Sequence, residues 1–164
     1  MSRVDYFLKL DGIEGESHDD KHQKEIELLS WSIGATNSGS FALGSGGGTG
    51  KVQFSDAHFT KHIDKSSAKL MEACATGQHI PKGVVTARKA GVKEGQIEYF
   101  KILLSDVLVS SYQLTGSGGG DVLPHESLSL NFAKVEFEYK EQKPDGSAGG
   151  LMRGGWHIKE NKKV

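Results

Sequence analysis

Residues 44–51 come nearest in this chain to a known chemical motif, because they are rich in glycine and end in Gly50 and Lys51. The phosphate-binding loop of nucleotide hydrolases ends in the same way. That loop also needs a glycine five residues before the Gly-Lys pair and a Ser or Thr directly after the lysine. Ser45 and Val52 occupy those positions here. The residues after Lys51 alternate like a strand instead of opening a helix, so we predict a flexible loop without nucleotide chemistry.

Two histidine pairs have a spacing that can hold a metal ion. His18 and His22, and again His58 and His62, are four residues apart, which would place both ligands on one face of a helix. His18 lies in a loop rich in Gly and Asp, His58 lies at a predicted strand end, and neither pair has a third ligand. We predict exposed or hydrogen-bonding histidines, with no metal and no cofactor.

The nucleophilic residues also lack the partners that catalysis requires. The serines of the glycine-rich loops are not in the strand-to-helix elbow of a Ser hydrolase. Cys74 is predicted to be a small core residue on a helix, because no neighbouring group would depress the pKa of its thiol. We therefore predict a protein without enzymatic activity.

Composition indicates one ordinary folded domain over residues 1–164, with 36% hydrophobic residues, 25% charged residues and a formal net charge of −1. The chain has no basic stripe of the kind that nucleic-acid binders carry. A single cysteine is compatible with a reducing compartment. The first residues alternate and carry charge, so we predict no signal peptide, and no apolar run is long enough to insert into a membrane.

Period-two alternation predicts strands along most of the chain. Residues 4–10 form a half-buried strand, and residues 51–59, 82–90, 96–105 and 106–115 continue the pattern. In residues 25–35 the apolar positions change from even to odd between Leu28 and Leu29, and in residues 127–139 they change between Phe132 and Ala133. A strand whose buried side changes contains a bulge or passes from one core to another.

One helix is predicted, with Asp64 as its N-cap, Gly77 at its end, and Ile63, Leu70, Met71 and Cys74 on one face. A last short strand is predicted over residues 156–159. The predicted fold is therefore mainly β, with bent, barrel-like antiparallel sheets and one flanking α-helix.

The chain resembles the Hcp (haemolysin-coregulated) family of type VI secretion proteins, with matches spread in order over essentially its whole length. The matching residues are Gly15-Glu16-Ser17, Trp31-Ser32, Gly50-Lys51-Val52, Phe59-Thr60-Lys61, Asp64-Lys65-Ser66-Ser67, Leu70, Arg88-Lys89-Ala90-Gly91, Asp106 to Ser111, Gly116-Ser117, Asn131-Phe132-Ala133 and Gly155-Trp156.

This resemblance implies a structural subunit of the inner tube of a Gram-negative type VI machine. Hexameric rings would stack into a tube, meet sheath and spike components, and carry small effector proteins in the lumen. The protein would be cytoplasmic before assembly and then secreted without a cleaved signal peptide. Only a short stretch follows the last long predicted strand, so we expect no fused effector domain.

The resemblance also implies two sets of functional residues. In the family the strand at residues 25–35 helps to line the lumen, which makes Ser30 and Ser32 candidate contacts for effectors. The family often carries an aromatic residue where this chain has Ile33. The long loop corresponds to one that contacts neighbouring subunits or rings, and its candidate contact residues are Ser38, Ser40, Phe41, Leu43, Gly46, Gly47 and Gly48.

Two alternatives remain open from the residues themselves. Phe41 and Leu43 could fold back on their own domain, although the resemblance favours docking on a neighbour. The domain could also be a monomeric β-barrel that binds a sugar or a peptide. Such a site usually presents exposed aromatic residues around a pocket, whereas the aromatic residues here fall mostly on positions predicted to be buried.

Overall fold

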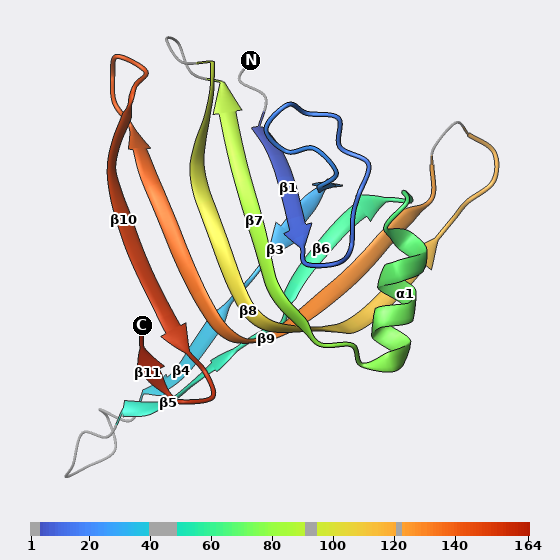
Figure 1. Ribbon diagram of the computed structural model, residues 1–164. Coiled ribbons are helices and arrows are strands. Elements are labelled where there is room, and N and C mark those ends of the chain that lie inside the picture. Colours follow the sequence, from blue (N-terminus) through green and yellow to red (C-terminus); the bar gives the residue numbers. More distant parts are fainter. Residues whose placement is uncertain (1–3, 40–48, 91–94, 121–122) are drawn as a thin grey trace.

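The computed structural model describes residues 4–39, 49–90, 95–120 and 123–164. Its elements are arranged as bent antiparallel sheets with one helix beside them (Figure 1). In chain order they are β1 (Val4–Leu10), β2 (Ile26–Leu28), β3 (Ser30–Ser32), β4 (Ala35–Gly39), β5 (Thr49–Phe54), β6 (Ala57–His62), α1 (Ser67–Thr76), β7 (Ile80–Ala90), β8 (Gln96–Thr115), β9 (His125–Gln142), β10 (Ala148–His157) and β11 (Lys162–Lys163). The predicted mainly β fold with one helix is confirmed.

The main sheet bends because its long central strand changes partners. The strand order is β11-β10-β9-β8-β7-β1-β2, and β6 joins β9 and β3 outside this path. The first part of β9, from His125 to Leu130, pairs with β6, whereas the part from Lys134 to Gln142 pairs with β10. One strand thus belongs to two differently oriented halves of the sheet, which produces the barrel-like curvature seen in Figure 1.

Both predicted changes of buried side coincide with a change of strand partner. Leu28 is buried and ends β2, which pairs with β1, while Leu29 is 48% exposed and leads into β3, which pairs with β6. In β9 the buried apolar positions up to Phe132 have even numbers, and apolar burial resumes at the odd position Val135. The expected burial of Leu29 is wrong, because this residue lies in the step between the two sheet halves.

Residues 96–115 form one continuous strand instead of the two that were predicted. Asp106, where the second strand was expected to begin, has a φ of +53°, in the left-handed region that Asp tolerates better than most residues. The buried positions change from Ile102 and Leu104 to Val107 and Val109 across this residue. The interruption in the sequence pattern therefore marks a bend within β8.

Helix α1 begins and packs slightly differently from the prediction. Its N-cap is Ser66, and Asp64 lies before the helix, where its Oδ1 accepts a hydrogen bond of 2.8 Å from the Ser66 backbone N–H. Gly77 ends the helix in the left-handed conformation, as expected. Leu70 is buried and Cys74 is half-buried, but Met71 is 49% exposed and Ile63 precedes the helix.

The last strands also differ from the expectation. Strand β10 begins at Ala148, so the glycine-rich stretch that was expected to connect elements is itself part of a strand. Gly155 fits there because a Cβ at this position would lie 2.9 Å from the Val135 carbonyl oxygen. The predicted strand at residues 156–159 is only the end of β10 together with a turn.

The hydrophobic core lies between the two halves of the bent sheet and extends under α1. Its fully buried members come from elements far apart in the chain: Leu8, Ile26, Phe59, Leu70, Ile80, Leu104, Val107, Leu128 and Leu130. An aromatic series continues the core toward the open side of the sheet, with ring centroids 6.0 Å apart for Tyr6 and Trp31, 5.8 Å for Trp31 and Phe100, and 5.6 Å for Phe100 and Phe137.

Candidate functional site

One face of the sheet formed by β3, β6, the first half of β9 and the second half of β8 carries neutral polar side chains. The pairing places Ser32 beside His58, His58 beside Ser129, and Ser129 beside Ser111. The opposite face of the same strands is buried, with Phe59 and Leu128 in the core. We call the outward side the polar face, and its members are Ser30, Ser32, His58, Thr60, Ser111, Gln113, Ser127, Ser129 and Asn131.

Side chains of the polar face hydrogen-bond to one another. The hydroxyls of Ser30 and Thr60 are 2.5 Å apart, and those of Ser111 and Ser129 are 2.5 Å apart. At one margin the Asn131 amide donates to Asp56 Oδ1 at 2.9 Å. These bonds hold short side chains against the strands, and Ser129 is itself buried beneath its neighbours, so the exposed surface consists of the hydroxyl, imidazole and amide groups around it.

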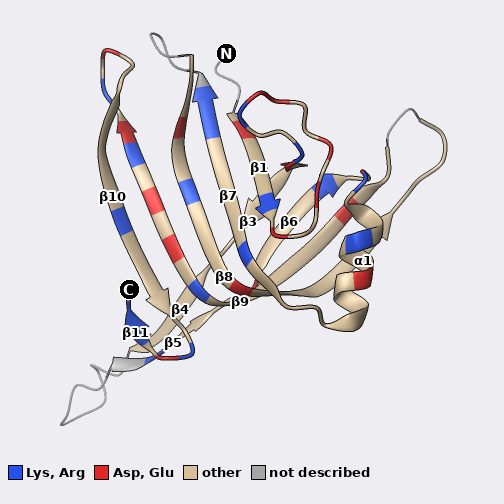
Figure 2. Cartoon of the chain, viewed as in Figure 1, with Lys and Arg blue, Asp and Glu red and all other residues tan. Residues whose placement is uncertain are grey.

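The other half of the sheet, formed by β10 and the adjoining parts of β8 and β9, carries charged side chains, whereas the polar face is neutral. Lys101, Glu138 and Arg153 are in register across β8, β9 and β10. Figure 2 shows alternating basic and acidic bands on β9 and a basic band on β10, whereas β3 and β4 carry none. The two candidate lumen residues, Ser30 and Ser32, are exposed and lie within the neutral half. Ile33 is half-buried and packs against the core instead of joining them.

The sheet that carries the polar face ends in an unpaired strand edge on each side. Strand β3 pairs only with β6. The pairing of β8 with β7 stops at Val107, so the β8 residues from Leu108 to Thr115 pair only with β9. Within the described residues, each edge therefore presents backbone N–H and C=O groups that could pair with another chain.

The long loop of the sequence analysis joins a separate hairpin. Strands β4 and β5 form a two-stranded sheet of their own, closed by the pair Gly39 and Thr49, and Figure 1 shows it extending from the body of the molecule. Ser38 lies on β4 and is exposed. The other predicted contact residues lie outside the described residues: Ser40, Phe41, Leu43, Gly46, Gly47 and Gly48. Lys51 lies within β5 and not at the start of a helix, which excludes the phosphate-loop interpretation. The single strand predicted over residues 51–59 is wrong in its extent, because β5 ends at Phe54 and β6 begins at Ala57 in another sheet.

Residues 11–25 form a loop that is fastened to the outer face of β1, β7 and β8. The two ring nitrogens of His22 lie 2.8 Å from Glu25 Oε2 and 2.7 Å from Glu98 Oε1, and the ring stacks on Phe7 with centroids 4.4 Å apart. The predicted hydrogen-bonding role of His22 is confirmed. Its pairing partner Glu98 was not predicted, because it is 76 residues away in the sequence.

Arg88 also holds this loop against the sheet, and it contacts the same Phe7 ring. Its guanidinium donates two hydrogen bonds to Asp19, of 2.8 and 2.7 Å, and lies 4.9 Å from the centre of the Phe7 ring. The hydrogen bond from Arg88 holds the pKa of Asp19 well below its usual range. Desolvation opposes ionisation of Glu98, but the hydrogen bonds and charges of Lys101 and His22 outweigh it and lower the pKa of this carboxyl.

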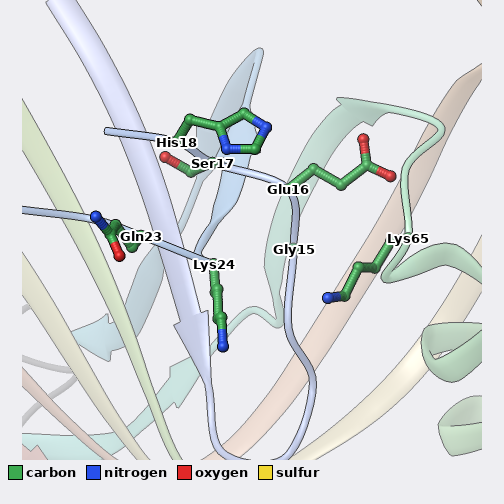
Figure 3. Close-up of a pocket in the computed structure, with 7 residues that line it drawn as sticks. All are labelled: Gly15, Glu16, Ser17, His18, Gln23, Lys24 and Lys65. Carbon is green, nitrogen blue, oxygen red and sulfur yellow. The ribbon is translucent and has the colours of Figure 1, made fainter. Parts of the chain in front are cut away.

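The fastened loop borders a polar pocket of about 380 Å³. Figure 3 shows Lys24 and Lys65 on either side of Gly15, with Glu16 and His18 nearby. Lys65 already pairs with Glu14 at 3.4 Å. Gly15 is required here, since a Cβ would lie 2.5 Å from the Glu25 carbonyl oxygen. The pocket offers no nucleophile with an activating base, and we assign it no chemistry.

The second histidine pair of the sequence analysis is separated by the strand geometry. His58 and His62 lie on the same side of β6, but His62 instead meets His125 of β9, with ring centroids 4.9 Å apart. Among the described residues, no group of three or more His, Cys, Asp or Glu side chains could hold a metal ion. No helix in that part of the chain is long and apolar enough to cross a membrane.

Comparison with known proteins identifies the family. The family described as "Type VI secretion system effector, Hcp" matches residues 7–139. The chain belongs to the Hcp family of type VI secretion proteins. It is 50% identical to Protein hcp1 of Pseudomonas aeruginosa over 159 residues, which cover 96% of this chain and 97% of that protein.

Solved Hcp structures agree with the fold. A type six secretion system protein matches with a TM-score of 0.92 at 35% identity and covers 99% of this chain and all of that one. Hcp1 from Salmonella typhimurium matches with a TM-score of 0.79, also at 35% identity, over 98% of this chain and 99% of that one. The predicted family and fold are therefore confirmed, and the family is one of structural secretion proteins.

Proposed function

We propose that this Hcp protein is the subunit of a type VI inner tube, in which six copies form a ring and rings stack. In this arrangement the polar face lines the lumen and contacts small effector proteins during export. Sheath and spike components are the further partners. The protein is cytoplasmic before assembly, leaves the cell without a cleaved signal peptide and acts without enzymatic activity of its own.

The observation that carries this proposal is the polar face with an open strand edge on each side. The two edges, on β3 and on the second half of β8, are different surfaces. A contact between the β3 edge of one copy and the β8 edge of the next is heterologous, and such contacts generate a ring when the rotation closes. The polar faces of all copies would then form one continuous inner wall.

The chemistry of the polar face suits transport of varied cargo. Its hydroxyl and amide groups can donate and accept hydrogen bonds. The Asp56 carboxylate, directly before β6, lies at its margin and is engaged by Ser110 and Asn131. A neutral wall neither repels nor tightly retains cargo of one charge. Ser30 and Ser32 are exposed on this wall and are the proposed effector contacts.

Native mass spectrometry and negative-stain electron microscopy test the assembly. We expect a hexameric mass and ring-shaped particles with a central hole. A monomer at every concentration up to the millimolar range would contradict the proposal and would favour the alternative of a monomeric binding module.

The cargo role is tested by placing charge on the wall. We expect Ser30→Glu together with Ser32→Glu to reduce the amount of effector that co-purifies per assembled ring, with the amount of ring measured by native mass spectrometry because β3 also carries one ring edge. The matched control is Ser117→Glu, at an exposed position in the loop between β8 and β9. Equal recovery of effectors with the wall variant and the control would remove the polar face from cargo contact.

A further inference from the structure

A second hollow, of about 710 Å³, lies where the fastened loop, β1, β2 and the end of β6 meet the loop before β9. Four large apolar side chains that are unusually exposed for their type line it: Val4 at 38%, Leu29 at 48%, Ile63 at 39% and Leu123 at 59%. Exposed apolar residues that cluster in one concave surface are typical of a contact site. We call this feature the acidic hollow, for the residues described next.

Carboxylates surround the apolar part of the hollow. Asp19 and Asp64 also line it, but they are engaged by Arg88 and Lys61. Glu16 and Glu27 are exposed and form no ion pair with any described residue. The hollow therefore presents unpaired negative charge next to apolar surface, and its natural partner carries apolar side chains flanked by positive charge.

The hairpin of β10 and β11 carries that combination. Lys159 and Lys163 are exposed and form no ion pair among the described residues, while Lys162 is held by Glu160 at 2.5 Å. Val164, which follows Lys163, is 48% exposed. We call residues 157–164 the basic hairpin. Its charge and its exposed apolar side chain are complementary to the acidic hollow.

The acidic hollow and the basic hairpin lie at opposite ends of the inner wall. The first half of β9 begins at His125, which pairs with His62 beside Ile63 of the hollow. It ends near Ala133, whose carbonyl oxygen accepts a hydrogen bond of 2.8 Å from Ile158 N–H in the basic hairpin. The eight residue-to-residue steps of extended strand from His125 to Ala133 separate the two surfaces by roughly 26 Å. A single copy therefore cannot bring them together.

The two surfaces also lie away from the strand edges that the ring requires. The open edges of β3 and β8 run along the sides of the polar sheet, whereas the hollow and the hairpin lie at the ends of its strands. We propose that the acidic hollow of one copy receives the basic hairpin of a copy in the next ring. This inference rests on the proposed ring assembly and specifies the contact between stacked rings.

Charge reversal on each side tests the contact. The hollow variant carries Glu16→Lys and Glu27→Lys, the hairpin variant carries Lys159→Glu and Lys163→Glu, and Glu72→Lys on the exposed side of α1 is the control. Ring formation is measured by native mass spectrometry, and ring–ring association by sedimentation equilibrium over increasing concentration. We expect hexameric rings from every variant.

We expect each reversed variant to weaken ring–ring association at least about tenfold, since every pair of rings would contain six such contacts with modest energy in each charge pair. The control should associate like the unmodified protein. An equimolar mixture of the two reversed variants should regain association. The lysines of the reversed hollow then meet the glutamates of the reversed hairpin, and the unmodified hollow of the hairpin variant meets the unmodified hairpin of the hollow variant. Raising the salt concentration should weaken association of the unmodified protein.

If the unmodified protein and both reversed variants associate ring to ring to the same extent, or if none of them associates, the proposed contact is wrong. That outcome leaves the ring assembly in place. Failure of the mixture to recover would also overturn it. A monomeric unmodified protein would instead remove the proposed function itself, so the two failures are distinguishable.

Discussion

Lys61 and Glu126 lie opposite each other on β6 and β9, and the Lys61 ammonium donates a hydrogen bond of 2.8 Å to Glu126 Oε2 although both side chains are fully buried. The same ammonium donates to Asp64 Oδ1 at 2.9 Å. Asp64 also accepts from Ser66 at the start of α1. This cluster joins the sheet that carries the polar face to the helix. Burial and the nearby Glu126 carboxylate raise the pKa of Tyr112, next to the cluster, to about 12.

Removing one partner of this ion pair should be strongly destabilising. Lys61→Met leaves the Glu126 carboxylate buried without its cation, and we expect the free energy of unfolding to fall by about 3–5 kcal/mol. The double variant Lys61→Met with Glu126→Leu should lose clearly less, because the fully buried carboxylate is then removed and Asp64, which also loses the lysine, keeps its hydrogen bonds from Ser66. Urea denaturation measures both, with Lys65→Met, at an exposed lysine, as the control. A double variant as unstable as Lys61→Met would contradict this account.

His22 should hold the loop at residues 11–25 against the sheet. Each ring nitrogen of His22 contacts one carboxyl group, Glu25 Oε2 at 2.8 Å and Glu98 Oε1 at 2.7 Å. His22→Ala removes both contacts and the stacking on Phe7. We expect amide hydrogen exchange at Gly15, Ser17 and Lys24 to accelerate by at least about tenfold, as local opening becomes easier. His18→Ala, in the same loop but exposed, should change little.

The pair Arg88 and Asp19 should contribute to acid sensitivity. The hydrogen bond from Arg88 lowers the pKa of Asp19 in the folded protein, so the pair stabilises the fold at pH values above the usual carboxyl pKa of 3.8. That contribution is lost progressively as the pH falls below 3.8 toward the folded pKa. Asp19→Asn should therefore lower stability most near neutral pH and least in acid. Thermal unfolding across pH checks this, and a constant difference would contradict it; Asp20→Asn is the control.

The loop residues Phe41 and Leu43 should matter for assembly and not for folding. We expect Phe41→Ser together with Leu43→Ser to weaken ring stacking or ring formation, because exposed apolar residues on such a loop are stabilised by docking on a neighbour. Circular dichroism should show an unchanged β fold. Ser117→Ala, at an exposed position in the loop between β8 and β9, is the control and should assemble normally. Unchanged tube formation in the Phe41 and Leu43 variant would mean that these side chains do not dock.

Local pattern was sufficient for most strands and for the side each one buries. The alternation of Ile26 and Leu28, and of Leu128 and Leu130, correctly predicts which residues face the core, since side chains alternate along any extended backbone. The interruptions at Leu28 and Phe132 also carried real information, because each one marks a change of strand partner. In β10 several positions are glycine, so no alternation of apolar and polar side chains is visible, and the strand was not predicted.

Alternation and family motifs are enough to identify a mainly β domain of the Hcp family in which Ser30 and Ser32 share the exposed side of a strand. Which distant residues meet is visible only in the folded chain: Lys61 with Glu126, His22 with Glu98, and His62 with His125. Periodicity depends on the backbone of one element, whereas these pairs depend on the register between strands, which is set by the packing of the whole sheet.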